Sequence, residues 1–539
     1  MTGIPVSARP HEPSLERLER AEELFADGDV TSARRMLSEC LDDPAIPVEH
    51  QVQALNDLGV IANAQGRPDE AERLLLGAVS RDAGYVPALE NLAALCARDD
   101  PVQATYWARR AAEAHSGAGE TMAGETAAGE LAELAPRDEA GVPGSTAAPR
   151  ALSRVLIVVD YFYPSLGGSE RLAEAAGATL QAKGLTVEVA TRRLPQRTAR
   201  EHRGMLVHEI DPERPDALQT VVAAGAYDGM LIFSAPTSWP IVASLRLQAP
   251  RPRIVAVPCI NAENSAALRA NPAILHAYAD LIATADVVGY SSHSGCDARL
   301  CEDLGLGGVY VPNAVERVSP RGELPGLASE PGLAGDAPLL LVVANMWPEK
   351  NHAGLLRALR DHPGRWRLAI IGEASPEAPH VAEEVRQLAN ADPRVHLLGP
   401  ADPGTVAAAM TQATALLLPS LAEATPLVVL EAMSHRLPWI ATPNCGAVHD
   451  HAGGLIVPVR MFGEGIDFLL DAPTAAGELG AAGLAHWEAS YTWDVMGPRY
   501  ADILRGTQVD ALAPPARALA ATEDVRARFY ERRARSKAA

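Results

Sequence analysis

The chain has 539 residues, 47% of them hydrophobic, and a formal net charge of −21 from 68 acidic and 47 basic side chains. This length is enough for about three domains, each with its own core. The acidic balance argues against a general nucleic-acid binder or an anionic-membrane binder, because both need clustered Lys and Arg. A small local anion-binding site is still compatible with this acidic charge balance.

The first residues, the lack of a long apolar run and the scattered cysteines favour a cytoplasmic protein. The first residues, "MTGIPVSARPHEPSLE", lack the apolar core of a signal peptide, and no run of eighteen apolar residues predicts a transmembrane segment. The six cysteines are scattered, which favours reduced thiols over disulfides or a metal site. We therefore expect a cytoplasmic location, and peripheral binding at the inner membrane face stays open.

Residues 14–115 are predicted to form helical repeats. Small residues recur 34 positions apart at Gly59 and Ala93, and "GRPDEAERLL" supplies a turn followed by a new helix. This stretch resembles the tetratricopeptide repeat (TPR), in about three copies. Stacked repeats of this kind present concave surfaces, so the resemblance implies a protein partner. A plain helical bundle is the alternative.

Residues 116–150 are low in complexity, dominated by Gly, Ala, Glu and Pro, and are predicted to be a flexible linker. From Arg154 the pattern changes to strand, helix, strand, which is typical of a parallel α/β sheet. The pattern breaks at a second Gly/Pro-rich stretch, 317–338, and then starts again. The expected strands are "RVLIVV", "TVEVATRR", "GMLIFS", "RIVAVPCI", "VVGYSS" and "GVYVPN" before this break, and "LLLVVANM", "WRLAIIGE", "VHLLGP", "ALLLPS", "PWIAT" and "GLIVP" after it.

Two α/β units, 151–316 and 339–485, are thus predicted, with a cleft between them. Ligands of open parallel sheets bind beyond the carboxyl ends of the strands. Residues 486–506 are predicted to return to the first unit as a crossover helix. Residues 507–539 form a tail, whose basic amphipathic pattern predicts a solvated terminal helix.

The stretch "EATPLVVLEAM" places one glutamate on each side of a predicted helix start. Thr425 and Pro426 have the residue types of an N-cap and a first-turn proline. Glu423 would lie just outside this start, and Glu431 about one and a half turns inside. The first amides of a helix attract phosphate, and carboxylates accept hydrogen bonds from vicinal hydroxyls. Phosphate flanked by two diols describes a nucleotide sugar.

The longer stretch "PSLAEATPLVVLEAMSHRLPWIAT" resembles the donor-binding signature of the family-four retaining glycosyltransferases, which have the GT-B fold. The resemblance runs from about Arg154 to Leu504. It implies two Rossmann-like domains, the first binding the acceptor and the second the nucleotide sugar. It also implies that Glu423 contacts the donor sugar and that Glu431 contacts the ribose.

Two more segments carry the resemblance. "PSLGGSERLAEAAGATLQAKGLTVEVAT" contains the glycine-rich loop of the family, and Lys350 in "VANMWPEKNHAGLLRAL" matches its diphosphate-binding lysine. The resemblance implies Glu423 and Lys350 as catalytic residues. The donor-binding residues that it implies are Gly167, Gly168, Asn345, Lys350, Gly372, Glu423, Thr425, Pro426, Leu427 and Glu431.

The sequence departs from the family in three places, one of them Arg436, which stands where the family commonly has Gly. Asn345 stands where the family usually has Arg, and the stretch "RIVAVPCINAENS" lacks the His that often faces the reacting sugar. Asn261, Glu263 and Asn264 are the polar residues available there. Asn345 and the missing His favour an alternative, a non-catalytic interaction or scaffold protein in which the repeats act and the GT-B part is degenerate.

The resemblance implies an enzyme that transfers a hexose from a nucleotide diphosphate sugar, with retention at the anomeric carbon. The resemblance also implies that no cofactor or metal is bound, and that Lys350 and the helix amides neutralise the leaving diphosphate instead. The acceptor stays open between a cell-envelope glycan and a protein or peptide. No nucleic-acid partner and no transmembrane segment are expected.

Overall fold

The computed structural model divides the chain into two compact units, Met1–Glu125 and Thr126–Ala539. The predicted linker 116–150 and the polar residues Asn261, Glu263 and Asn264 lie outside the described residues. The structure describes residues 12–96 except 27, 43–45 and 83–84, then 107, 108, 111 and 114, and residues 151–538 except 165–166, 212–216, 234–250, 261–284, 294–295, 299–307, 322–336, 377, 508, 510–511 and 513–514.

The described part of the first unit is helical. Small residues lie where consecutive helices touch: a Cβ on Gly59 would lie only 2.7 Å from the Cγ of Leu75, and Ala71 and Ala78 are fully buried. The side-chain amide of Asn91 donates to Asn56 Oδ1 at 2.9 Å. The helical prediction is confirmed, whereas the TPR resemblance stays a prediction. The helices are α1 (Glu12–Ala26), α2 (Val30–Asp42), α3 (Val48–Ala64), α4 (Pro68–Arg81) and α5 (Val86–Cys96).

The second unit begins with an eight-stranded sheet in the order β3-β4-β2-β1-β5-β6-β7-β8. All neighbours are parallel except the β3–β4 pair, an antiparallel edge hairpin that the sequence interpretation missed. Helix α8 (Gly168–Ala182) follows β1, and α9 (Ala217–Gly225) follows β4. The strands are β1 (Arg154–Val159), β2 (Thr186–Arg192), β3 (Glu201–His202), β4 (Met205–Ile210), β5 (Gly229–Phe233), β6 (Arg253–Val257), β7 (Val287–Tyr290) and β8 (Gly308–Tyr310).

A second, wholly parallel sheet follows, with six strands in the order β11-β10-β9-β12-β13-β14. Its strands are short and apolar, as expected for a sheet with both faces covered. The strands are β9 (Leu339–Val343), β10 (Arg367–Ile371), β11 (Val395–Gly399), β12 (Ala415–Leu418), β13 (Trp439–Ala441) and β14 (Gly454–Ile456). The helices are α14 (His352–Arg360), α15 (Pro379–Asn390), α16 (Pro403–Gln412), α17 (Leu427–Ser434) and α18 (Phe462–Asp471). The predicted pair of parallel α/β units is confirmed.

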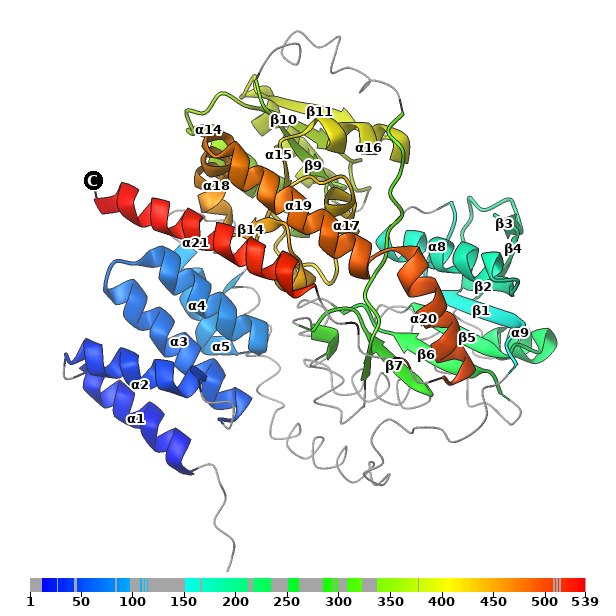
Figure 1. Ribbon diagram of the computed structural model, residues 1–539, viewed down its shortest axis with the longest axis horizontal. Coiled ribbons are helices and arrows are strands. Elements are labelled where there is room, and N and C mark those ends of the chain that lie inside the picture. Colours follow the sequence, from blue (N-terminus) through cyan, green and yellow to red (C-terminus); the bar gives the residue numbers. More distant parts are fainter. Residues whose placement is uncertain are drawn as a thin grey trace, which may run out of the picture. The chain divides into compact units, whose positions relative to one another are not determined.

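Two consecutive helices lead back from the second sheet to the first (Figure 1). Helix α19 (Pro473–Ser490) lies on the second sheet's side, and α20 (Trp493–Arg505) packs against α8 and the first sheet. Met496, Tyr500 and Leu504 of α20 belong to the core of the first sheet. The chain therefore ties the two sheets together through this return as well as through the strand-to-strand connection.

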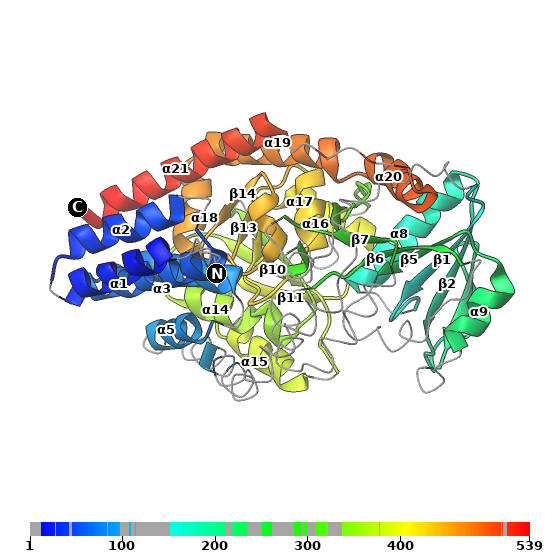
Figure 2. The ribbon, with the colours of Figure 1, turned by 90° about the horizontal axis from the view of Figure 1, so that it is seen from below.

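The terminal helix α21 (Ala516–Ala538) is not a solvated tail, so that part of the sequence interpretation is wrong. It lies along α19, as Figure 2 shows. Val525 and Phe529 are 0% and 2% exposed and join the core of the second sheet. The hydroxyl of Thr522 accepts a hydrogen bond from the amide of Gly453 at 3.0 Å. Some of its basic residues, such as Arg532 and Arg535, are exposed, whereas Arg526 is largely buried and donates to the carbonyl of Gly454 at 2.9 Å.

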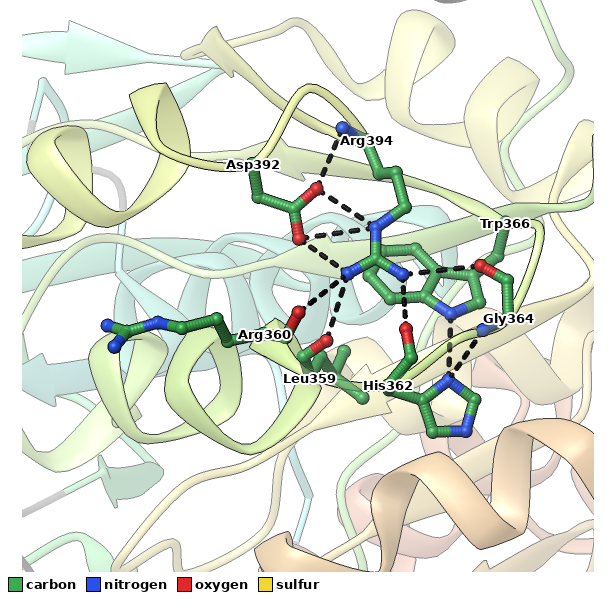
Figure 3. A network of polar contacts seen from close by, with 7 residues as sticks. All are labelled: Leu359, Arg360, His362, Gly364, Trp366, Asp392 and Arg394. Carbon is green, nitrogen blue, oxygen red and sulfur yellow. Dashed lines mark hydrogen bonds and ion pairs between the residues drawn. The ribbon is translucent and has the colours of Figure 1, made fainter.

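Arg394 joins several segments of the second sheet's domain (Figure 3). Its guanidinium donates to four backbone carbonyl groups just beyond or within the end of α14, those of Leu359, Arg360, His362 and Gly364. It also pairs with the Asp392 carboxylate at 2.7 Å and lies 3.9 Å from the ring centre of Trp366. A helix leaves its last carbonyl groups without partners, and Arg394 satisfies them here.

The cysteines and the hydropathy of the helices agree with the sequence expectations as far as the described residues reach. The cysteines described are thiols, and Cys40, Cys96 and Cys445 are buried. Cys301 lies outside the described residues. No helix in the described part of the chain is long and apolar enough to cross a membrane.

Candidate nucleotide-sugar site

The loop between β12 and α17 begins the site. Helix α17 starts at Leu427, and Pro426 stands at its N-cap with φ −69° and ψ 109°. The prediction of Thr425 as the N-cap is wrong: its hydroxyl donates to Ser291 Oγ at 2.7 Å, beyond the end of β7 in the first sheet. The extended backbone of Pro426 moves the helix start one residue along. Thr425 thus joins the two sheet domains instead of capping the helix.

Glu423 lies in that loop beside Lys350. The lysine Nζ is 2.6 Å from Glu423 Oε1, and the hydroxyl of Ser420 donates to the same oxygen at 2.9 Å. Burial opposes the charge of Lys350, yet the Glu423 carboxylate outweighs that effect, so the pKa of Lys350 is raised above its ordinary value. The two predicted catalytic residues are therefore together at the carboxyl ends of β9 and β12, with Lys350 charged.

Asn351 holds the lysine loop against the glutamate loop, and the sequence interpretation missed it. Its φ of +53° lies in the left-handed region, which Asn adopts more readily than most residues. Its side-chain amide donates to the carbonyl of Pro419 at 3.1 Å, and the amide of Leu421 donates to the carbonyl of Glu349 at 2.7 Å. The turn formed by Pro348–Lys350 is thereby fixed. The sequence signal was an Asn placed directly before a helix.

Glu431 is the fifth residue of α17, a little over one turn inside the helix, and only 8% exposed. It accepts a charge-assisted hydrogen bond from Arg171 of α8, which belongs to the first sheet's domain. This ion pair crosses from one sheet domain to the other and joins residues 260 positions apart. Arg171 was not among the predicted site residues.

The two predicted glycines lie at the start of α8. A Cβ on Gly167 would lie 2.3 Å from Glu170 Oε2, so glycine is needed here for the glutamate to fold back over the helix start. At Gly168 the nearest atom to such a Cβ is the Leu427 side chain, at 4.0 Å. The N-termini of α8 and α17 therefore face each other across the interface between the sheet domains.

Asn345 and Gly372 lie at the carboxyl ends of β9 and β10. Asn345 Oδ1 accepts a hydrogen bond from the amide of Glu373 at 3.1 Å. Gly372 has φ +155°, and a Cβ there would lie 2.0 Å from the carbonyl oxygen of Ala344. The glycine is required by this close backbone approach. Both residues thus lie at the strand ends where the donor is predicted to bind. Their role in donor binding stays a prediction.

Further hydrogen bonds link the two sheet domains beside this site. Asp450 Oδ2 accepts from Ser292 Oγ and from the amide of His293, both at 2.7 Å. The side-chain amide of Asn313 donates to the carbonyl of Thr425 at 3.3 Å. Within the described residues, no group of three or more His, Cys, Asp or Glu side chains is arranged to hold a metal ion.

Parts of the chain are similar to known glycosyltransferases. Residues 337–472 match a family described as "Glycosyl transferases group 1". A stretch of 84 residues is 39% identical to a GDP-mannose-dependent monoacylated alpha-(1-6)-phosphatidylinositol monomannoside mannosyltransferase of Corynebacterium glutamicum, covering 15% of this chain. The match spans 22% of the length of that relative.

Solved structures resemble the second unit over nearly their whole length. A sucrose-phosphate synthase from Thermosynechococcus elongatus is 20% identical, with a TM-score of 0.56 over 66% of this chain and 98% of its own. A glycosyltransferase from Rickettsia africae is 15% identical, with a TM-score of 0.55 over 66% and 98%. Anabaena HepE in complex with UDP and glucose is 17% identical, with a TM-score of 0.55 over 65% and 99%.

These likenesses confirm the predicted GT-B fold with its two Rossmann-like domains. The domain that carries Lys350, Glu423 and Glu431 is the one that matches the group 1 glycosyltransferases. The roles of these side chains stay predictions.

Proposed function

We propose that the protein is a glycosyltransferase that transfers a hexose from a nucleotide diphosphate sugar to an acceptor, with retention at the anomeric carbon. The single observation that carries this proposal is the Lys350–Glu423 pair, 2.6 Å apart at the mouth of α17. The group 1 family match over 337–472 and the GT-B fold support it. Fold alone allows many activities, so the site is what favours this one.

The donor would lie across the N-terminus of α17. The first amides of α17, at Leu427 and Val428, carry a partial positive charge that suits the diphosphate, and Lys350 adds a full charge beside them. Glu423 would accept hydrogen bonds from hydroxyls of the hexose. The buried carboxylate of Glu431 would accept hydrogen bonds from the ribose hydroxyls.

The chemistry needs no side chain to act as an acid. The bond between the anomeric carbon and the diphosphate oxygen breaks, and a bond to the acceptor oxygen forms on the same face of the sugar. The acceptor proton passes to the departing phosphate. Lys350 and the α17 amides would stabilise the charge that develops on this leaving group, which is the term that most often dominates such catalysis. In this proposal that charge is balanced without a metal ion.

The acceptor would be a cell-envelope glycan or a protein or peptide. The curated relative is named for GDP-mannose and for a phosphatidylinositol mannoside, and HepE was solved with UDP and glucose. GDP-mannose and UDP-glucose are therefore the first donors to test. The helical unit, with its TPR-like spacing, would bind a protein partner. We place the enzyme in the cytoplasm, with the inner membrane face as the site of a lipid-linked acceptor.

Donor turnover tests the proposal. The purified full chain is incubated with GDP-mannose and with UDP-glucose, with water as the acceptor, so that each consumed donor gives a free hexose and a nucleoside diphosphate. The released nucleoside diphosphate is measured for the wild type and for Glu423→Gln. We expect one donor to be consumed by the wild type, and the rate to fall by about 10²-fold or more in the variant, as when a transition-state contact is removed. A folded wild type that consumes no nucleotide sugar would instead support the non-catalytic scaffold.

A further inference from the structure

The ion pair between Arg171 and Glu431 raises a question about the donor site. Glu431 is 8% exposed, whereas the side chain of Arg171 is 44% exposed and reaches it from the other sheet domain. A buried carboxylate needs donors around it, and Arg171 supplies them in this structure. The proposed function assigns the same carboxylate to the ribose. Ribose hydroxyls and the Arg171 guanidinium would therefore compete for Glu431.

The local charges show what Arg171 would do once ribose hydroxyls replace it. Two cations, Lys350 and Arg171, have been described beside the facing ends of α8 and α17, against three carboxylates, Glu170, Glu423 and Glu431. A nucleoside diphosphate adds further negative charge to this surplus. Neutral hydroxyls can replace Arg171 at Glu431, but they cannot balance a diphosphate. A guanidinium released from Glu431 would be available for that task.

The start of α8 makes this cation more necessary. Glu170 folds back over Gly167, so the amides that begin α8 already face a carboxylate of their own helix. Such a carboxylate cancels the attraction of a helix N-terminus for phosphate. Arg171 is the next residue, and the adjacent Gly168 faces Leu427 of α17 at 4.0 Å. The first sheet's domain therefore offers the diphosphate a guanidinium rather than bare amides.

We propose that Arg171 is a donor-binding residue that exchanges Glu431 for the diphosphate when the ribose binds. This inference rests on the proposed function. Ribose hydroxyls take the place of the guanidinium at Glu431, and the guanidinium turns to the phosphate oxygens, which its planar fork can contact in pairs. The exchange keeps both charges paired and holds the donor between the two sheet domains. It makes binding depend on ribose and diphosphate together.

Calorimetric titration of the full chain tests this exchange. GDP, UDP, guanosine and uridine are titrated into the wild type, Arg171→Gln and Arg171→Lys. We expect Arg171→Gln to weaken binding of the preferred diphosphate about tenfold, the effect of losing one charge-assisted contact. The affinity for the matching nucleoside should stay within about twofold or rise, because Glu431 loses its competitor. Arg171→Lys should recover part of the diphosphate affinity.

A matched control is Arg203→Gln, which removes another Arg that pairs with α8, at 2.7 Å from Glu174. It should leave both affinities unchanged. If Arg171→Gln lowers the affinities for the diphosphate and for the nucleoside equally, Arg171 only positions Glu431. If the variant binds the diphosphate as tightly as the wild type or more tightly, Arg171 only competes with the ligand for Glu431. Either result would overturn the exchange while leaving the proposed function intact. A folded wild type that binds none of the four compounds would overturn both.

Discussion

Lys350 Nζ lies 2.6 Å from Glu423 Oε1, although 73 positions separate the two residues in the chain. Each comes from the carboxyl end of a different parallel strand, and the bond between Asn351 and the Pro419 carbonyl holds their loops together. The pair places one positive and one negative group side by side at the start of α17. In the proposed function, Lys350 would supply the charge that binds phosphate and Glu423 the acceptor for sugar hydroxyls.

Replacing Lys350 by Ala should remove diphosphate binding and also lower the stability of the second unit. Glu423 would keep only Ser420 as a described side-chain donor, and the half-buried carboxylate would lose its counter-charge. We expect a loss of about 1–3 kcal/mol, below the range for a fully buried pair because both side chains are partly exposed. Urea unfolding of Lys350→Ala, Glu423→Ala and the double variant measures the coupling between them.

Lys183→Ala, at the exposed end of α8, is the control for removing a lysine. A double variant whose loss equals the sum of the two single losses would contradict the coupling.

Glu431 should make the site sensitive to the sugar of the nucleotide. A carboxylate that grips the ribose diol loses one hydrogen bond when the 2′-hydroxyl is missing. Because the buried carboxylate then lacks one donor, we expect a 2′-deoxynucleoside diphosphate to bind about tenfold more weakly than its ribose form. This difference in affinity between the two nucleotides should be smaller in Glu431→Gln, because a neutral amide accepts hydrogen bonds less strongly than a carboxylate. Equal discrimination by the wild type and the variant in competition titrations would contradict the ribose role.

Arg394 should matter for stability and not for the chemistry. Replacing it by Ala removes the donors to the end of α14 and leaves the Asp392 carboxylate without its counter-charge. We expect a loss of about 1–3 kcal/mol in chemical unfolding, because several partly buried acceptors lose their donor together. Arg394→Lys should recover only part of the lost unfolding free energy, because lysine lacks the planar guanidinium that donates in several directions. An unfolding free energy within about 0.5 kcal/mol of the wild type would contradict this role.

The last helix should be required for folding of the second sheet's domain. Phe529→Ala removes a side chain that is 2% exposed, and a loss of about 3–5 kcal/mol is expected for such a cavity. Tyr530→Ala is the neighbouring control, because that side chain is 40% exposed. Denaturant midpoints of the two variants should differ clearly. Similar, small effects of both would show that α21 is not held on the domain.

Burial of His486 should make stability fall in mild acid. Burial lowers its pKa from 6.5 to about 4, so the unfolded chain binds the proton more readily than the folded one. Its contribution is therefore fully present above pH 6.5 and is lost as the pH falls towards 4, on the order of 3 kcal/mol in total. His486→Gln keeps an acceptor for the amide of Ala452 but does not titrate. Its unfolding free energy should change less between pH 7 and pH 5; an equal change would contradict the assignment.

The sequence was enough to predict features that depend on local pattern. The twelve apolar strands and the helix after "LAEATP" follow from residues close together in the chain. The importance of Lys350 and Glu423, which are 73 positions apart, followed only from the family resemblance. Strand β3 escaped because it has only two residues, and β4 because its buried and exposed residues alternate, so it lacks a continuous apolar run. Periodicity showed that α21 is amphipathic, but it could not show that the apolar face has a partner.

Features that depend on pairing across the cleft could not be predicted. Thr425 looks like an N-cap by type, and only the fold shows that Ser291 takes its hydroxyl. Arg171 occurs in an ordinary amphipathic helix, and its partner Glu431 lies 260 positions away. Local sequence carries no information about which residues of one sheet domain face the other.

The most direct test of the central claim is a thermal-shift measurement with GDP and UDP on the wild type and on Glu431→Ala. A ligand that binds only the folded state stabilises it by RT ln(1 + [L]/Kd), about 2.7 kcal/mol at a hundredfold excess over Kd. We expect a clear rise in Tm with one of the two nucleotides, and the loss of this rise in Glu431→Ala. A well-folded wild type whose Tm moves with neither nucleotide would contradict a nucleotide-sugar site in this cleft.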